Sequence, residues 1–272
     1  MRLLSIYFLA LSFSISAYAG KVQTVTTHSD AMQKDINAIV ITPEGYSTSK
    51  EYPVLYLLHG YSGNYTEWSK QVPDLDDYAD QYQLIIVCPD GNYGSWYFDS
   101  EVKTESKYET YVAKELVHWV DEHFSTLADK NGRAITGLSM GGHGALYLAF
   151  KHQDVYALAG SMSGGVDITP FPNNWELASY LGSYAEHKER WEAHSVINLT
   201  NLLTPNSLKL IIECGTSDFF YNANVKLHEK LEYTNIPHTF ISSPGGHTWD
   251  FWRNAIKYQL VFFDSYFKTV KS

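Results

Sequence analysis

The sequence predicts an α/β domain built on a mainly parallel β-sheet, and three observations support this. Short apolar runs alternate along the chain with segments of helical periodicity, the pattern of a parallel sheet covered by helices. A Gly-x-Ser-x-Gly sequence centred on Ser139 joins one apolar run to one helical segment. Asp218 and His247 follow two later expected strands. Parallel sheets carry their sites beyond the carboxyl ends of their strands, so these three residues are expected to meet.

The expected strands follow in order along the chain. Residues 22–27 and 36–41 alternate apolar and polar side chains like an antiparallel edge hairpin. Residues 239–242 are expected to form the last strand, which completes a sheet of about eight. The runs between them are continuously apolar, as in strands buried on both faces. They are 54–58, 84–88, 134–138, 157–162 and 208–214.

Helices are expected between these strands, on both faces of the sheet. The longest apolar stripe runs through 108–124 with spacings of three and four residues. Residues 140–151 follow the serine motif directly, and 225–233 and 251–267 complete the set.

The segment 163–207 does not fit the alternation. It is rich in Pro, Asn and aromatic residues, with helices expected near 175–181 and 185–193. A long excursion between two strands is typical of a cap over a site, and the alternative is a surface insertion without function.

The first residues resemble a secretion signal. Arg2 supplies a positive charge, residues 3–13 are almost wholly apolar, and Ala17 and Ala19 are small residues at the cleavage positions. We therefore expect a signal peptide over 1–19 and an exported protein, periplasmic or extracellular. A retained N-terminal anchor is the alternative.

The remainder, 20–272, is expected to form a single domain. No later segment approaches the about 20 apolar residues that span a membrane, so no membrane-spanning helix is expected. The formal net charge of −10 disfavours nucleic acid and anionic membranes as partners. No feature of the sequence indicates an oligomeric state.

Ser139 occupies the position of a nucleophile at a sharp strand-to-helix turn. The turn crowds the residues two before and two after the serine, and Gly137 and Gly141 have no Cβ to clash there. The following helix directs backbone N–H groups toward developing negative charge. The alternative is a tight glycine-rich turn with an uninvolved serine.

A serine nucleophile needs a base, and the base needs an acid that orients it. Ser139, Asp218 and His247 follow one another in the order Ser, Asp, His. We assign Ser139 as nucleophile, His247 as general base and then general acid, and Asp218 as the residue that fixes the imidazole tautomer. Asp167 is a rival acid, and Asp250 is a weaker one that would instead cap the last helix.

Two backbone N–H groups are expected to form an oxyanion hole. One belongs to Met140, the residue after the nucleophile. The other comes from the turn after the strand 54–58, where we favour Tyr61 over Gly60 or Ser62. The neighbouring His59 is expected to brace this turn by hydrogen bonding.

Aromatic residues make up 15% of the chain and suit a groove for sugars or aryl groups. Trp96 and Tyr97 follow the strand that ends at Cys88, and Trp175 lies in the expected cap. We expect these three side chains to form an aromatic wall of a substrate site. The alternative for each is a place in the core.

With these residues in place, the chain resembles the esterase D-type branch of the α/β-hydrolases. That branch includes feruloyl, acetyl and tributyrin esterases, S-formylglutathione hydrolases and mycolyltransferases. The segment 163–207 departs from its pattern. The resemblance rests on four motifs: Leu57-Leu58-His59-Gly60-Tyr61-Ser62-Gly63, Gly137-Leu138-Ser139-Met140-Gly141-Gly142, Cys214-Gly215-Thr216-Ser217-Asp218-Phe219 and Gly246-His247-Thr248-Trp249.

The resemblance implies the α/β-hydrolase fold, Ser139, Asp218 and His247 as a triad, and Tyr61 and Met140 as oxyanion donors. It implies a carboxylic ester hydrolase that acts through an acyl-enzyme on short-acyl or hydroxycinnamoyl esters, carried by small molecules or polysaccharide. Two alternatives are an acyltransferase of the mycolyltransferase type and a non-catalytic carbohydrate-binding protein. No metal or organic cofactor is expected.

The strand order usual in this family also bears on the two cysteines. One disulfide would suit an exported protein. In the family fold, however, the strands that end at Cys88 and Cys214 lie four strands apart, roughly 19 Å at about 4.8 Å per strand. A disulfide needs Cα atoms within about 7 Å. The resemblance therefore predicts two free, buried thiols.

Overall fold

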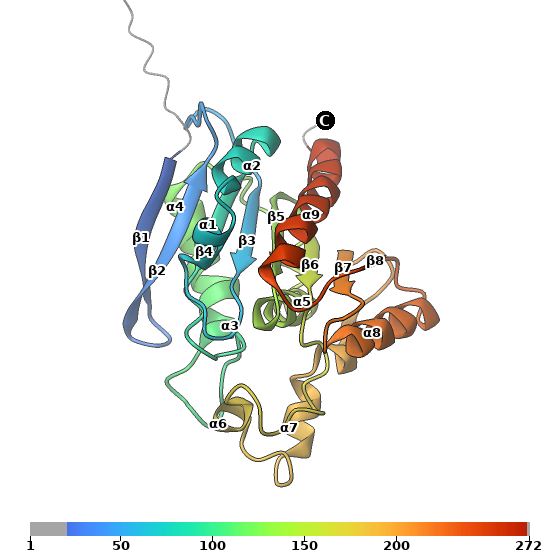
Figure 1. Cartoon of the computed structure of the whole chain (residues 1–272). Coiled ribbons are helices and arrows are strands. Elements are labelled where there is room, and N and C mark those ends of the chain that lie inside the picture. Colours follow the sequence, from blue (N-terminus) through green and yellow to red (C-terminus); the bar gives the residue numbers. More distant parts are fainter. Residues whose placement is uncertain (1–20, 271–272) are drawn as a thin grey trace, which may run out of the picture.

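The computed structural model describes residues 21–270, and the predicted signal peptide 1–19 lies outside them. Within this range an eight-stranded sheet has the order β1-β2-β4-β3-β5-β6-β7-β8 (Figure 1). Antiparallel pairing joins β1 to β2 and β2 to β4, while every other neighbouring pair is parallel. The predicted fold class is confirmed. The strands are β1 (Lys21–Ser29), β2 (Lys34–Thr42), β3 (Val54–Leu58), β4 (Ile85–Pro89), β5 (Arg133–Gly137), β6 (Leu158–Met162), β7 (Lys209–Gly215) and β8 (Thr239–Ser243).

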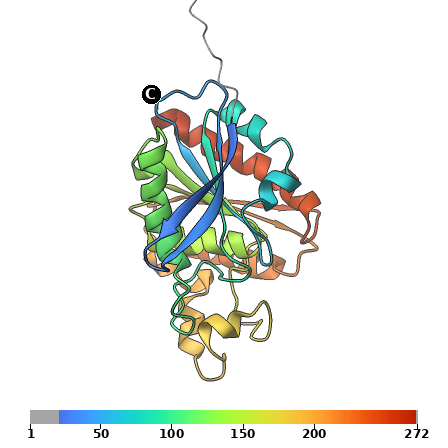
Figure 2. The same ribbon diagram turned by 90° about the vertical axis from the view of Figure 1, so that its left-hand side faces the viewer.

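Helices cover both faces of this sheet (Figure 2). The helical stripe predicted over 108–124 is one continuous element with a π-helical segment, Tyr111–Glu115, in its middle. Its parts and the other helices are α1 (Glu67–Gln71), α2 (Leu75–Tyr82), α3 (Tyr108–Thr110), α4 (Leu116–His123), α5 (Met140–Lys151), α6 (Leu177–Leu181), α7 (Lys188–Ala193), α8 (Tyr221–Tyr233) and α9 (Trp249–Val270).

Alternate residues of each central strand supply two separate apolar cores. Tyr56 of β3 belongs to the core shared with α4, α5 and α8, whereas Leu55 and Leu57 face the core shared with α1, α2 and α9. Continuous apolar strands follow from this arrangement, because both faces of the sheet are buried. None of the helices described, over residues 21–270, is long and apolar enough to span a membrane.

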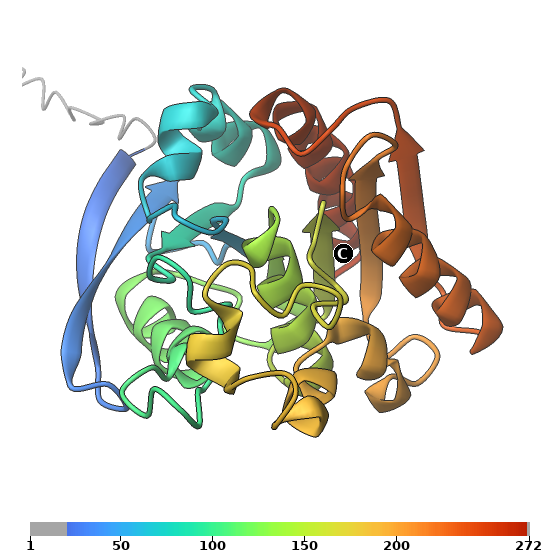
Figure 3. The same ribbon diagram turned by 60° about the horizontal axis from the view of Figure 1, so that its bottom comes forward.

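The segment between β6 and β7 lies across the carboxyl end of the sheet (Figure 3). It holds α6, α7 and two short 3₁₀ turns. Trp191 of α7 is fully buried and donates its indole N–H to the Gly182 carbonyl at 2.9 Å. The Ser100 hydroxyl, from the segment after β4, donates to the Tyr180 carbonyl at 2.7 Å. The first contact ties two parts of the segment together, and the second attaches the segment to the rest of the chain.

Cys88 and Cys214 are both buried and unpaired, as predicted. They lie on β4 and β7, which β3, β5 and β6 separate. Burial raises the pKa of both thiols, which disfavours the reactive thiolate.

We expect a thiol reagent to leave the native protein unmodified and to titrate both cysteines after unfolding in guanidinium, because both thiols are inaccessible in the folded chain. The measurement is a titration with and without denaturant, in the absence of reductant. An unfolded protein without free thiols would contradict the prediction.

Candidate active site

The serine motif forms a sharp turn between β5 and α5. β5 ends at Gly137 and α5 begins at Met140, so the turn contains only two residues. Ser139 has φ 55° and ψ −116°, a strained backbone conformation for a residue with a side chain. A Cβ at Gly141 would lie 2.5 Å from the Leu58 carbonyl oxygen, so the close approach to β3 requires glycine there.

Ser139, His247 and Asp218 form a continuous chain of hydrogen bonds. His247 Nε2 lies 2.8 Å from Ser139 Oγ, and His247 Nδ1 lies 2.8 Å from Asp218 Oδ2. The other Asp218 oxygen, Oδ1, accepts the Phe220 N–H at 2.8 Å. Because Nδ1 donates its proton to the carboxylate, Nε2 is left to accept the proton of the Ser139 hydroxyl.

Two neighbouring loops bring the acid and the histidine together. Asp218 follows β7 and His247 follows β8, and backbone hydrogen bonds join the two loops. Thr216 N–H donates to the Ser243 carbonyl at 2.9 Å, and Ser217 N–H donates to the Gly245 carbonyl at 2.8 Å. The parallel sheet therefore places both side chains at one end.

The rival acids have other partners. Asp167 accepts the N–H and the hydroxyl of Thr169, at 3.1 and 2.7 Å. Asp250 is exposed and pairs with Arg253 at 2.9 Å. Of the three candidate acids, Asp218 is the one hydrogen-bonded to His247.

Hydrogen bonding of the loop after β3 distinguishes the candidate oxyanion donors. Ser62 N–H donates to the Tyr93 carbonyl at 2.7 Å, and the Gly60 backbone interacts with the Glu67 carboxyl and lowers its pKa. In the described part of the chain, the N–H groups of Tyr61 and Met140 form no hydrogen bond. These two groups are therefore available to an oxyanion near Ser139.

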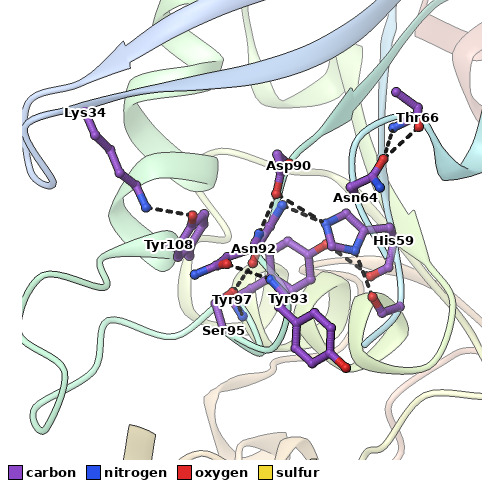
Figure 4. A network of polar contacts seen from close by, with 12 residues as sticks. Lys34, His59, Asn64, Thr66, Asp90, Asn92, Tyr93, Ser95, Tyr97 and Tyr108 are labelled. Atoms are coloured by element: carbon purple, nitrogen blue, oxygen red, sulfur yellow. Dashed lines mark hydrogen bonds and ion pairs between the residues drawn. The ribbon is translucent and has the colours of Figure 1, made fainter. Parts of the chain in front are cut away.

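His59 braces this loop (Figure 4). Its Nδ1–H donates to the Gly60 carbonyl at 2.8 Å, and its Nε2 accepts the Gly91 N–H at 2.8 Å. The Tyr97 hydroxyl donates to the His59 carbonyl at 3.1 Å. Burial lowers the pKa of the His59 ring, which keeps it neutral and able to accept from Gly91.

A cavity of about 260 Å³ opens at the serine. Its aromatic wall differs from the prediction. Trp175 lines the cavity, but Trp96 and Tyr97 are 1% and 0% exposed and lie in the core. Trp96 packs edge-on against His143, and its indole N–H donates to the Trp175 carbonyl at 3.3 Å. The prediction that Trp96 and Tyr97 contact a substrate is therefore corrected, since both side chains are buried and Trp96 packs against Trp175 from behind.

Other aromatic residues complete the wall. Phe219 is 54% exposed, stacks on Trp175 at 5.8 Å and lies 4.2 Å from the His247 ring between centroids. Trp249 and Trp252, from the start of α9, also line the cavity. The sequence offered one signal for them: Phe219 directly follows Asp218, and Trp249 is two residues after His247.

The family model described as "Putative esterase" matches residues 29–263. The chain belongs to this putative esterase family. The family predicted from the four sequence motifs is thereby confirmed.

Two curated relatives and one solved structure illustrate the similarity. An esterase of Mycobacterium tuberculosis is 29% identical over 76% of this chain and 51% of its own length. An acetyl esterase of Caldicellulosiruptor saccharolyticus is 28% identical over 76% of this chain and 82% of its own. The structure of a ferulic acid esterase superposes with a TM-score of 0.79 at 26% identity, covering 92% of this chain and 99% of that one. The chain spans about half the length of the mycobacterial relative.

Proposed function

We propose that this protein is a serine carboxylic ester hydrolase. The observation that carries the proposal is the hydrogen-bond chain from Ser139 through His247 to Asp218, with 2.8 Å at both links. Membership of the putative esterase family supports it. A non-catalytic carbohydrate-binding role would not require these three side chains to be aligned.

A residue of this site can then be assigned to each step of the reaction. Ser139 Oγ attacks the ester carbonyl carbon while His247 Nε2 accepts the hydroxyl proton. The N–H groups of Tyr61 and Met140 stabilise the oxyanion, and each such donor is worth about 2.7–4 kcal/mol in the transition state. The C–O bond of the ester breaks, the alcohol leaves with the proton from His247, and water repeats the sequence on the acyl-enzyme to release the acid.

Short-acyl or hydroxycinnamoyl esters, carried by carbohydrate, are the substrates we propose. The acetyl esterase relative supports a small acyl group. A relative named endo-1,4-beta-xylanase/feruloyl esterase, from Xylanibacter ruminicola, supports an aryl acid on a polysaccharide and is 33% identical over 54% of this chain. Trp175 and Phe219 offer aromatic faces to such an acid.

Trp175→Ala is expected to raise KM for methyl ferulate about 10-fold and to change KM for an acetyl ester little. The reason is that an aryl acid loses a stacking face, whose contribution is about 0.5–1.5 kcal/mol beyond area burial. Steady-state kinetics on both esters give the comparison, and Trp175→Phe is the control that keeps an aromatic face. An equal change for both esters would contradict an aryl-binding role.

Covalent modification of the nucleophile is the sharpest test of the proposed function. A fluorophosphonate should add covalently to Ser139, found by mass spectrometry of the modified peptide, and Ser139→Ala should stay unlabelled. Labelling elsewhere, or none in a folded protein, would overturn the assignment.

The same triad would also serve acyl transfer to an alcohol. A mycolyltransferase of Mycobacterium leprae, 25% identical over 75% of this chain, keeps this alternative open. Product analysis with added sugar acceptors separates the two reactions. Hydrolysis yields the free acid alone, whereas acyl transfer yields an ester of the added sugar.

Export is part of the same proposal. A signal peptide over 1–19 would leave a mature chain that begins at Gly20. N-terminal sequencing of the protein from the culture medium or periplasm tests this. The proposal also treats 163–207 as a cap, since Trp175 within it lines the cavity at Ser139.

A further inference from the structure

Glu67 is an acidic residue beside the serine that the reaction above does not use. It is the first residue of α1, and its side chain lines the same cavity as Ser139 and His247. The carboxyl lies under the loop after β3, where a Cβ at position 63 would overlap its Oε2 atom. Gly63 therefore leaves the space that Glu67 occupies.

The Glu67 carboxyl is poorly compensated. The Gly60 backbone stabilises its charged form, but Oε2 is buried without a hydrogen-bond partner. Within residues 21–270 no Lys, Arg or His side chain forms an ion pair with it. Burial raises its pKa from the ordinary value, the direction expected of a carboxyl that lacks compensation.

The rest of the cavity wall does not offset this charge. Glu67 is the one Asp, Glu, Lys or Arg among the lining residues, and His247 is neutral when it acts as a base. The other lining side chains are apolar or aromatic, apart from the Ser139 hydroxyl. A charge in such a cavity is screened much less than a charge on the surface.

We propose that Glu67 makes this site select uncharged acyl groups and reject esters whose acyl group carries a carboxylate. The inference rests on the proposed function, since it concerns the substrate of the same serine. A second carboxylate in the cavity would be repelled by Glu67 and would find no Lys or Arg side chain among the lining residues to pair with. A neutral acyl group is not repelled by Glu67 and can pack against the aromatic wall.

The test compares two ethyl esters of similar shape at about pH 8, above the ordinary range of a glutamate. Monoethyl succinate carries a carboxylate where ethyl 4-methylpentanoate carries an isopropyl group. We expect kcat/KM for the neutral ester to exceed that for the anionic ester at least about 10-fold in the wild-type protein. Glu67→Gln should lower this ratio about 10-fold, through faster hydrolysis of the succinate.

Three controls separate the charge of Glu67 from other effects. Glu67→Gln keeps a carbonyl oxygen for the Gly60 backbone, so the loop keeps its support. Glu176→Gln removes an exposed charge near Tyr61 and should leave the ratio within about twofold. About 0.5 M NaCl should leave the wild-type ratio high, because salt screens surface charge far more than buried charge.

The outcomes distinguish this proposal from the function it rests on. A ratio that Glu67→Gln leaves unchanged, or that Glu176→Gln lowers equally, overturns the role of Glu67 alone. Rates that survive Ser139→Ala, or no turnover of either ester, overturn the proposed function instead.

Discussion

Asp218→Asn is expected to lower kcat for ester hydrolysis by about 10,000-fold. This is the loss of rate seen when the histidine of a serine triad is held in the wrong tautomer. The Asp218 carboxylate accepts two N–H groups, from Phe220 at 2.8 Å and from His247 Nδ1 at 2.8 Å. An asparagine amide has one acceptor oxygen and one donor NH₂.

The asparagine can satisfy only one of these donors. The Phe220 N–H cannot accept, so it holds the amide oxygen, and the NH₂ group then faces His247 Nδ1. The imidazole must place its proton on Nε2 to accept that NH₂, and Nε2 can no longer take the proton of Ser139. Because the Phe220 hydrogen bond survives, the fold should be retained.

Kinetics on p-nitrophenyl acetate test this, with circular dichroism to check the fold. Asp167→Asn is the matched control, since that carboxylate bonds Thr169 and not His247 and should leave kcat within about twofold. A loss below tenfold in Asp218→Asn would show that Asp218 does not set the tautomer.

The strands and the positions of Ser139, Asp218 and His247 could be predicted from the sequence because one rule covers them. Buried parallel strands are continuously apolar, and their carboxyl ends meet at one edge of the sheet. Ser139 and Asp218 follow such strands and His247 follows the edge strand β8, so chain topology brings all three to the same end. Their mutual hydrogen bonds follow from that placement.

The short helices α1 and α2 were not predicted because few of their residues are buried. In α1 only Trp68 is buried, and in α2 only Leu75 and Ala79 are. Two or fewer buried positions do not produce a recognisable helical period. This gap matters for function, since α1 supplies Glu67 to the cavity.

The orientation of Trp96 and Tyr97 could not be predicted because it depends on unusual backbone angles. Both residues have positive φ, 53° and 61°, which bulky residues adopt only when packing enforces it. The turn directs the Tyr97 ring against Gly91 and Gly144, in the core. The sequence favours the Tyr61 N–H over those of Gly60 and Ser62, but it does not show the acceptors near each N–H that decide the choice.

Glu213→Gln is expected to stabilise the folded protein by about 5 kcal/mol at pH 9 and by little at pH 4. Glu213 lies on β7, is 1% exposed, and its Oε1 atom has no hydrogen-bond partner. Burial raises its pKa from 4.5 to about 8, and the Gln259 side chain offsets only part of that rise. Between these two values the folded chain holds a proton that the unfolded chain has released.

The free energy of unfolding of the wild-type protein should therefore decline as pH rises from about 4.5 to about 8, by up to about 1.4 kcal/mol per pH unit from this group. Above that window the loss is complete, because both states are then ionised. Glutamine has nearly the same shape and does not titrate, so the difference in unfolding free energy between the two proteins should grow across the window and then stay constant.

Urea unfolding at a series of pH values measures this difference in the free energy of unfolding. Asp250→Asn, at a side chain that is 93% exposed, should give a curve parallel to the wild type. If the unfolding free energy of Glu213→Gln runs parallel to that of the wild type across these pH values, the Glu213 carboxyl is no harder to ionise in the folded protein than in the unfolded chain.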